Sequence, residues 1–353
     1  MYQSIRPLLF KLDPERIHGV TLRLIQLAGQ LPPAYALLRR MFEVDDPRLE
    51  VGTFGVKFRN PIGLAAGYDK NGVAVRGLSA LGFGHIEVGT VTRHKQIGNP
   101  KPRVQRVLEA QGVINSMGFP NEGVDALKIT RGAARVGINI GKSKDTPVEL
   151  AAEDYCALFK RVYLNADYVA INISSPNTLN LRQLQARALI EGLLQQVAAV
   201  RDEVSAARPA TTLRSAQDAR RVPLLVKIAP DLTEGEIDDV LAAISLAGID
   251  GLIATNTTIG RSGIPARYHD LKGGLSGAPL RDRSTAIIHY IARQTSGKLP
   301  IVGVGGIASA RDALEKLEAG ATLLQVYTGL IYAGPSLVRQ INRALIKPDR
   351  SAQ

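Results

Sequence analysis

The segment Ile171–Asn180, with the sequence INISSPNTLN, decides the fold class of this chain. An apolar run that begins at Tyr168 ends abruptly at Ser174, and Pro176 cannot continue a strand because it has no N–H to donate. Polar groups at the carboxyl ends of many strands are typical of the active site of an α/β barrel. The same change from apolar to polar or glycine residues recurs in GINIG (137–141), VKIAP (226–230), ATNT (254–257) and VGVGG (302–306).

Strand-like and helical patterns alternate along most of the chain, and about eight successive β–α units predict a (β/α)8 TIM barrel of the α/β class. The expected strands lie at 61–66, 85–90, 135–140, 168–173, 223–229, 251–255, 300–304 and 323–327. The expected helices lie at 71–81, 121–133, 147–165, 188–206, 233–247, 281–295, 309–319 and 334–346. The alternating segment 49–58 predicts a hairpin that closes the barrel floor, and the polar segment 207–221 predicts a surface excursion.

Residues 1–45 predict an N-terminal helical extension that is separate from a barrel spanning 46–353. Asp13-Pro14 is a typical helix start, with an N-cap followed by proline at the first helical position. Pro32-Pro33 end this helix and begin a second one. The first helix carries an apolar stripe at helical spacing, formed by Ile17, Val20, Thr21, Leu24, Leu27 and Ala28. The two helices either dock on the barrel or present an apolar surface, rimmed by Arg39-Arg40, to lipid.

Composition argues against a nucleic-acid-binding protein, a metalloprotein and a membrane-spanning protein. The 353 residues carry a formal charge of +12, which favours anionic partners, but no dense basic block with interleaved aromatics predicts nucleic-acid binding. The single cysteine, Cys156, lies in a helical pattern, and the five scattered histidines predict no metal site. The sequence contains neither a signal peptide nor an apolar run long enough to span a membrane. We therefore expect a protein on the cytoplasmic side that can still lie on a membrane surface.

The ends of the expected strands predict a flavin mononucleotide (FMN) site. Gly303–Ile307 follows the seventh strand and Gln325–Gly329 ends the eighth, which is where many barrels bind phosphate. The looser Rossmann interpretation of the glycines needs an acidic residue at the end of the next strand, and Gln325 lies there instead. Several asparagines at the other strand ends suit a ring that alternates C=O and N–H groups. Lys227 can stabilise negative charge on such a ring.

Seven motifs, in order and at sensible spacing, together resemble the dihydroorotate dehydrogenase family over nearly the whole chain, including LDPER (12–16). They are AAGYDK (65–70), NSMGF (115–119), NISSPNT (172–178), KIAPD (227–231), TNTT (255–258), GGLSG (273–277) and GVGGI (303–307). The resemblance implies an FMN-dependent oxidoreductase that oxidises (S)-dihydroorotate to orotate in de novo pyrimidine (UMP) biosynthesis. Because the chain has an N-terminal extension and Ser175 at the position of the catalytic base, it is most similar to the quinone-dependent, membrane-associated class (class 2).

The resemblance also implies roles for individual residues. Ser175 is the expected catalytic base, and Ser116 departs from the family pattern, which has arginine there. The expected substrate-binding residues are Lys70, Asn115, Ser116, Met117, Gly118, Phe119, Asn172, Asn177, Asn256 and Thr257. The expected cofactor-binding residues are Ala66, Gly67, Tyr68, Asp69, Lys70, Thr90, Asn139, Asn172, Lys227, Thr255, Gly277, Gly306, Tyr327 and Thr328. The implied partners are dihydroorotate or orotate, a membrane quinone and, by peripheral contact at the cytoplasmic face of the cell membrane, lipid.

Two alternative classes stay open at the level of sequence. Another FMN barrel, such as a tRNA dihydrouridine synthase, explains the basic charge but needs a catalytic cysteine in a loop, whereas Cys156 lies in a helical pattern. A non-redox barrel, either an isomerase or a phosphate-ligand binding protein, explains the phosphate site but binds no flavin.

Overall fold

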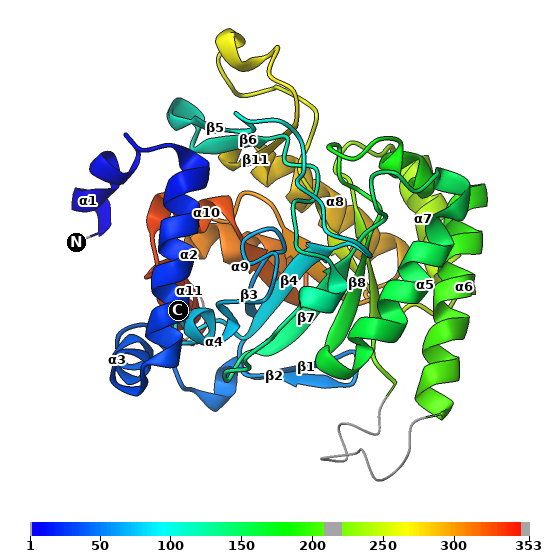
Figure 1. Ribbon diagram of the computed structural model, residues 1–353, viewed down its shortest axis with the longest axis horizontal. Helices are drawn as coiled ribbons and strands as arrows, with labels where there is room; N and C mark the ends of the chain where they lie inside the picture. Colours follow the sequence, from blue (N-terminus) through cyan, green and yellow to red (C-terminus); the bar gives the residue numbers. More distant parts are fainter. Residues whose placement is uncertain (1, 208–220, 347–353) are drawn as a thin grey trace, which may run out of the picture.

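The computed structural model describes residues 2–207 and 221–346, and it contains the predicted barrel. Eight parallel strands close on themselves in the order β10-β12-β13-β3-β4-β7-β8-β9 (Figure 1). The (β/α)8 prediction is therefore confirmed. The barrel strands are β3 (Ile62–Leu64), β4 (His85–Val91), β7 (Arg135–Ile140), β8 (Tyr168–Asn172), β9 (Leu224–Ile228), β10 (Gly251–Ala254), β12 (Ile301–Val304) and β13 (Leu323–Val326).

Helices cover the outside of the barrel (Figure 1). They are α4 (Val75–Ser79), α5 (Ala151–Val162), α6 (Arg187–Ala206), α7 (Glu234–Leu246), α8 (Arg281–Gln294), α9 (Ala310–Glu318), α10 (Thr328–Ala333) and α11 (Leu337–Leu345). Short 3-10 helices occur in the connections. These are η1 (Pro47–Leu49), η2 (Leu108–Ala110), η3 (Val124–Ala126), η4 (Val148–Leu150), η5 (Tyr163–Asn165), η6 (Leu181–Gln185), η8 (Ala266–Tyr268) and η9 (Ala278–Leu280).

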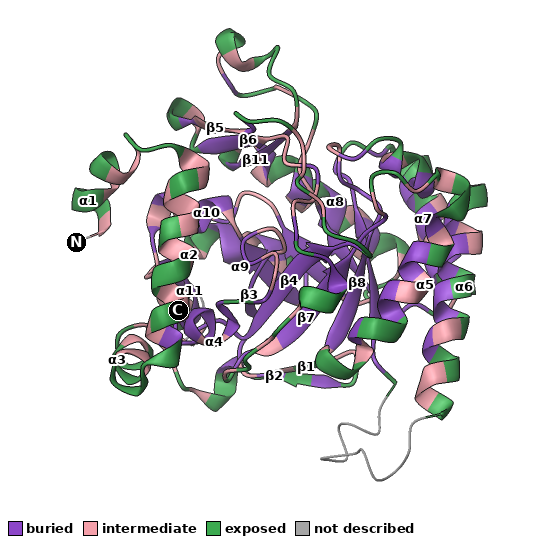
Figure 2. Cartoon of the chain, in the orientation of Figure 1, coloured by how far each residue is buried: buried purple, intermediate pink, exposed green. Residues whose placement is uncertain are grey.

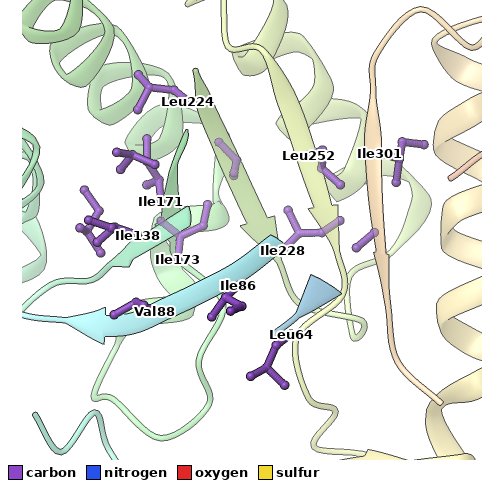
Figure 3. Close-up of a cluster of buried hydrophobic side chains, with 14 of the residues drawn as sticks. Leu64, Ile86, Val88, Ile138, Ile171, Ile173, Leu224, Ile228, Leu252 and Ile301 are labelled. Atoms are coloured by element: carbon purple, nitrogen blue, oxygen red, sulfur yellow. The ribbon is translucent and has the colours of Figure 1, made fainter. Parts of the chain in front are cut away.

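Side chains of the barrel strands alternate between the helices and the barrel interior, as the two-residue period of a strand requires. In β9, Leu224, Val226 and Ile228 belong to the large apolar core that the strands share with the helices (Figure 3). Leu225 belongs instead to a second core inside the barrel, and Lys227 shares its face of the strand. A polar side chain such as Lys227 therefore points into the barrel interior, although the surrounding strand sequence is almost entirely apolar.

Small sheets close the two ends of the barrel (Figure 1). The expected floor hairpin is present as antiparallel β1 (Val51–Thr53) and β2 (Val56–Phe58). Phe58 is fully buried, with its ring 5.5 Å from that of His85. At the opposite end β5 (Val104–Val107), β6 (Gly112–Asn115) and β11 (Gly274–Gly277) form an antiparallel sheet that the sequence did not predict.

Three helices precede the barrel: α1 (Tyr2–Leu9), α2 (Pro14–Gln30) and α3 (Pro32–Phe42). The predicted start of α2 is confirmed, because a carboxylate oxygen of Asp13 accepts hydrogen bonds from the backbone N–H groups of Glu15 (3.1 Å) and Arg16 (2.9 Å). The predicted break at Pro32-Pro33 is also confirmed. Helix α1 was not predicted.

Helix α2 docks with one face and leaves another open, so both sequence-based alternatives hold in part. Leu22 and Ile25 pack against the main core. A Cβ atom on Gly29 would lie only 2.6 Å from the backbone nitrogen of Gly77, so glycine lets α2 approach α4 closely. On the opposite side several leucines stay exposed, including Leu24 at 59%, and Figure 2 shows α2 and α3 in a mixture of pink and green.

Two helix predictions are wrong in extent. Segment 121–133 contains only η3, because the Asn121 side chain accepts the N–H groups of Thr92 and Gly123, and Gly123 has a positive φ of 85°. Segment 71–81 is helical only in α4, because the buried carboxylate of Asp69 binds the N–H groups of the preceding loop. Of the expected excursion at 207–221, residues 208–220 lie outside the described residues.

Candidate active site

One cavity of about 910 Å³ extends from the carboxyl ends of the barrel strands to the N-terminal helices. Most of the predicted site residues line it, although they come from different strand ends. The predicted residues that line the cavity are Ala66, Gly67, Tyr68, Lys70, Thr90, Asn115, Met117, Gly118, Phe119, Asn172, Ser175, Asn177, Lys227, Thr255, Asn256, Thr257, Gly277, Gly306, Tyr327 and Thr328. Asp69, Ser116 and Asn139 do not line it.

Side chains from the ends of four barrel strands, β4, β7, β8 and β10, form one hydrogen-bonded network. Asn172 Nδ2 donates to Thr90 Oγ1 (2.9 Å) and to Asn139 Oδ1 (3.1 Å). Thr90 Oγ1 in turn donates to Asn139 Oδ1 at 2.6 Å. Asn256 Nδ2 donates to Asn172 Oδ1 (3.3 Å) and to Ser174 Oγ (3.0 Å). Asn139, fully buried behind Thr90, therefore fixes the orientation of groups that do face the cavity.

The loop after β8 carries Ser175, which is buried to 5% exposure. Its Oγ accepts the backbone N–H of Asn177 at 3.2 Å, so the loop itself orients the hydroxyl. Asn177 Nδ2 donates to Asn115 Oδ1 at 3.1 Å and thereby joins this loop to the end of β6. Asn99, which the sequence did not indicate, donates through Nδ2 to the carbonyl oxygens of Ser116 (2.9 Å) and Asn177 (3.2 Å).

Lys70 is a cationic side chain that lines the cavity. Its Nζ donates to the carbonyl oxygen of Gly67 at 2.8 Å, and burial lowers the pKa of Lys70 to about 8. The adjacent Asp69 is fully buried and accepts the N–H groups of Val73 (3.0 Å) and Ala74 (2.7 Å). Burial raises the pKa of the Asp69 carboxyl. Asp69 thus shapes the loop that presents Lys70 rather than facing the cavity.

A buried carboxylate lies beneath the cavity, in the centre of the barrel. Glu87 is fully buried, and its oxygens accept hydrogen bonds from Asn139 Nδ2 (2.8 Å), Gln325 Nε2 (2.8 Å) and Tyr168 OH (3.2 Å). Lys227 Nζ lies 3.5 Å from Glu87 Oε1, and its side chain is 6% exposed. The sequence did not indicate Glu87, because it lies within an apolar strand, but the barrel interior makes it the partner of the one predicted cation there.

Glycines form a narrow cradle at another part of the cavity wall. A Cβ on Gly306 would lie 2.4 Å from Arg281 Cα, and one on Gly277 would lie 2.3 Å from the carbonyl oxygen of Gln111. Both glycines also have positive φ, 74° and 96° respectively, which favours glycine. Thr328, at the start of α10, lies beside them and shares a hydrogen bond of 2.8 Å with Ser276. Only glycine fits at these two positions of the cavity wall, and backbone without a side chain suits the close approach of a phosphate group.

The far end of the cavity is apolar and lies among the N-terminal helices. The helical side chains that line it include Ile5, Leu9, Ile17, Leu24, Leu38 and Met41. Tyr68 marks the border with the barrel, since its ring contacts both Tyr327 (5.9 Å) and His18 (4.8 Å). Burial lowers the pKa of His18 to about 4, so this histidine is neutral at pH 7.

The closed barrel, with polar side chains at the carboxyl ends of its strands and a cavity that continues among apolar helices, has the architecture of a β/α-barrel enzyme. A sequence model described as "Dihydroorotate dehydrogenase" matches residues 48–348. The chain belongs to the dihydroorotate dehydrogenase family.

Relatives and solved structures agree with this family. A "Dihydroorotate dehydrogenase (quinone)" of Stutzerimonas stutzeri is 50% identical over 345 residues, which are 96% of this chain and 96% of that protein. One of Christiangramia forsetii is 46% identical and covers 98% of this chain and 99% of that protein. The crystal structure of an Eimeria tenella DHODH in complex with ferulenol has a TM-score of 0.85 and 36% identity, and covers 96% of this chain and 94% of that chain.

The expected enzyme class, a quinone-dependent dihydroorotate dehydrogenase of pyrimidine biosynthesis, is therefore confirmed, and the two alternative classes are wrong. The family is flavin-dependent. Among residues 2–207 and 221–346, no helix has the length and apolar character needed to cross a membrane.

Proposed function

We propose that this chain oxidises (S)-dihydroorotate to orotate at the barrel mouth, with FMN as its flavin, and passes the electrons to a membrane quinone at the N-terminal helices. The single observation that carries the proposal is the continuity of the cavity, which joins Ser175 and the amides to the apolar side chains of α1, α2 and α3. The reductive half of the reaction is thereby assigned to the polar end of the cavity, and the oxidative half to its apolar end.

The residues present fit FMN. The glycine cradle at Gly277 and Gly306 leaves room for a phosphate group, with Thr328 beside it. Lys227 provides a cation for the electron-rich part of the ring, and Glu87 holds that cation. The other side chains and backbone groups suited to hold FMN are Ala66, Gly67, Tyr68, Lys70, Thr90, Asn172, Thr255 and Tyr327, with Asp69 and Asn139 supporting them from behind.

FMN, when bound, supplies the two-electron chemistry that accepts hydride from C6 of dihydroorotate and delivers electrons to quinone. Ser175 takes the proton from C5. A serine hydroxyl is a weak base on its own, so its proton needs a path away from the site. Within the described part of the chain the buried hydroxyl of Thr178 has no hydrogen-bond partner, which supports a place for Thr178 on this path. Phe119 is the second residue that we assign to the path.

Substrate recognition relies on amides and on one lysine. Lys70 and the backbone of the Asn115–Phe119 loop, which includes Ser116, Met117 and Gly118, bind the substrate carboxylate, while Asn177, Asn256 and Thr257 bind its ring. Asn172 lies between the two ligands. The hydrogen bonds among these amides support the assignment, because they orient each donor and acceptor before the substrate arrives.

Residues 1–45 form the quinone-access and membrane-contact segment, and residues 46–353 form the FMN barrel. On α2 and α3 the exposed leucines Leu27 (53%) and Leu37 (58%) lie near the exposed arginines Arg23 and Arg40. Exposed apolar side chains next to arginines suit an anionic lipid surface. We therefore place the protein as a peripheral protein at the cytoplasmic face of the cell membrane.

The test is dihydroorotate turnover with quinone, fumarate and NAD supplied in parallel, together with the release of flavin from the purified protein. We expect turnover with quinone alone, and free FMN after acid precipitation, since phosphate and ring are held by loops. Flavin that stays on the polypeptide, or turnover with fumarate or NAD in place of quinone, would contradict the proposal.

A further inference from the structure

Arg182 and Asp231 lie just outside the cavity and join three of the loops that surround it. Arg182 belongs to η6, which follows the Ser175 loop, and Asp231 lies in the loop after β9. Their side chains form an ion pair of 2.7 Å and are 21% and 23% exposed. Neither residue lines the cavity. They are neighbours of the site and not ligands of the substrate.

The guanidinium of Arg182 uses a different nitrogen for each loop. Nε donates to the carbonyl oxygen of Ser174 (3.1 Å), in the loop after β8. Nη2 donates to the carbonyl oxygen of Thr257 (2.9 Å), in the loop after β10, and Nη1 donates to Asp231. Because the donors of a guanidinium lie in one rigid plane, these contacts fix the three loops relative to one another.

Asp231 makes further contacts between the loop after β9 and the loop after β10. Its carboxylate also accepts hydrogen bonds from the hydroxyl of Thr258 and from the backbone N–H of Ile259 (3.2 Å), both in the loop after β10. Gln185, at the end of η6, accepts the backbone N–H of Ala229 (2.9 Å) and ties η6 to the end of β9. The loops after three consecutive barrel strands therefore meet at the Arg182–Asp231 pair.

Two of the joined loops carry residues that line the cavity, namely Ser175 in one loop and Asn256 and Thr257 in the other. Ser174 precedes Ser175 in one loop, and Thr257 follows Asn256 in another. We propose that Arg182 and Asp231 are positioning residues for the dehydrogenation, which hold the Ser175 loop against the Asn256–Thr257 loop and so fix where the substrate meets its base. This inference rests on the proposed function of the two loops.

A positioning role and a purely structural role have different consequences. If the pair has only a structural role, its loss lowers the unfolding midpoint and leaves the rates of the folded holoenzyme unchanged. A displacement of about 1 Å between reacting groups costs about 100-fold in rate. If the pair positions the loops, its loss slows the reductive half-reaction and leaves the oxidative half-reaction, which is assigned to the apolar end of the cavity, unchanged.

The experiment compares holoenzyme variants in the two half-reactions. Flavin reduction by dihydroorotate and reoxidation by a short-chain quinone are followed by anaerobic stopped-flow absorbance, and orotate affinity is followed by the flavin spectrum. For Arg182→Ala we expect reduction to slow by about 10- to 100-fold, with normal FMN content and normal reoxidation. The matched control is Arg187→Ala, which removes a 63% exposed arginine paired with Glu191 at the start of α6 and should change neither rate.

Arg182→Lys and Asp231→Asn keep the test valid if the alanine variant does not fold. A lysine ammonium is a point charge and cannot reproduce the three fixed contacts of Arg182. An asparagine at position 231 has one acceptor oxygen in place of two. We therefore expect a slower reductive half-reaction in both variants. Combining Arg182→Ala with Asp231→Asn should slow reduction by less than the product of the two single effects, because both variants lose the contact between these residues. Wild-type reduction rates in Arg182→Lys and Asp231→Asn would overturn the proposal.

Ser175→Ala, measured in parallel, separates this proposal from the base assignment. A fast Ser175→Ala with a slow Arg182→Ala would overturn the base role and leave the positioning role of the pair standing. A slow Ser175→Ala with a fast Arg182→Ala would overturn the positioning role alone.

Discussion

The two ends of the cavity are built on different principles. At the barrel end, Asn172, Asn256 and Thr90 are joined by hydrogen bonds of 2.9 to 3.3 Å, so each group has a fixed direction. At the helical end, Ile5 and Leu24 contribute apolar surface that is still 48% and 59% exposed. Directional contacts select one small polar molecule, whereas apolar surface accepts any long hydrophobic one. The comparison predicts strict specificity for dihydroorotate at the barrel end and tolerance of different quinones at the helical end.

The largest expected effect is at the barrel end. Ser175→Ala removes the proposed base but leaves the amide network intact, so flavin reduction by dihydroorotate should fall by about 10²–10⁴-fold. Anaerobic single-turnover reduction across pH measures this rate, while FMN content and orotate affinity should stay near wild type. Ser175→Cys should retain some activity, since a thiol can take the same proton. Wild-type reduction by Ser175→Ala would make Ser175 a turn residue and require another base.

The second effect concerns the charge beneath the cavity. Lys227→Met leaves Glu87 buried without its cation, and breaking a buried ion pair in this way typically costs about 3–5 kcal/mol. We expect a lower urea midpoint together with weaker FMN retention or slower flavin reduction. The double variant Lys227→Met with Glu87→Gln should recover stability but not flavin reduction. Recovery of both would mean that Lys227 acts only as a partner of Glu87, and normal flavin content with normal reduction in Lys227→Met would refute its cofactor role.

The same contrast explains what the sequence could predict. Strand ends such as Ser174–Asn177 were predictable, because the change from apolar to polar residues is local and parallel strands bring their carboxyl ends together. Glu87 was not, because only barrel closure shows which side of β4 faces Lys227. The pairing of Gly274–Gly277 with Gly112–Asn115 was also hidden, since sequence patterns do not report contacts between distant segments.

For the helical end, the sequence predicted two alternatives, docking on the barrel or exposure to lipid, and did not decide between them. The stripe from Ile17 to Ala28 indicated an amphipathic helix, but its spacing could not tell docking from exposure. The structure resolves this through Gly29, whose missing side chain lets α2 dock on α4 with a face that the stripe did not include. The apolar stripe is thereby left to line the cavity and to face outwards.

The third effect tests the helical end. Leu27 and Leu37 are exposed and do not line the cavity, so replacing both with Gln should weaken binding to anionic vesicles without changing turnover of a short soluble quinone. A leucine buried in lipid contributes about 1.5–3 kcal/mol, so we expect at least about tenfold weaker vesicle binding for each. Leu246→Gln, on the 62% exposed leucine of α7, is the matched control. Equal vesicle binding by the helical variant and the control would remove lipid contact from this face.

The smallest effect returns to the barrel end and concerns pH. Burial lowers the pKa of Lys70 from its usual value of 10.5 to about 8, so Lys70 in the free enzyme is a cation below pH 8 and neutral above it. Orotate carries a carboxylate throughout this range, and its affinity should therefore be full below pH 8 and fall by up to about tenfold per pH unit above it. Because the unfolded chain keeps this proton up to pH 10.5, the same group makes folding stability rise with pH across that interval.

Lys70→Gln separates the contribution of Lys70 from other titrations. Its orotate affinity should be low at every pH and should show no break near pH 8, while a short-chain quinone should reoxidise the reduced variant at the wild-type rate. Spectral titration of the flavin with orotate measures the affinity at each pH. A break that persists in Lys70→Gln would assign it to another group, and a wild-type affinity at pH 7 would exclude Lys70 as the carboxylate partner. A break near pH 8 in quinone reoxidation as well would contradict the contrast itself, because His18 at the apolar end has a pKa of about 4 and titrates far below this range.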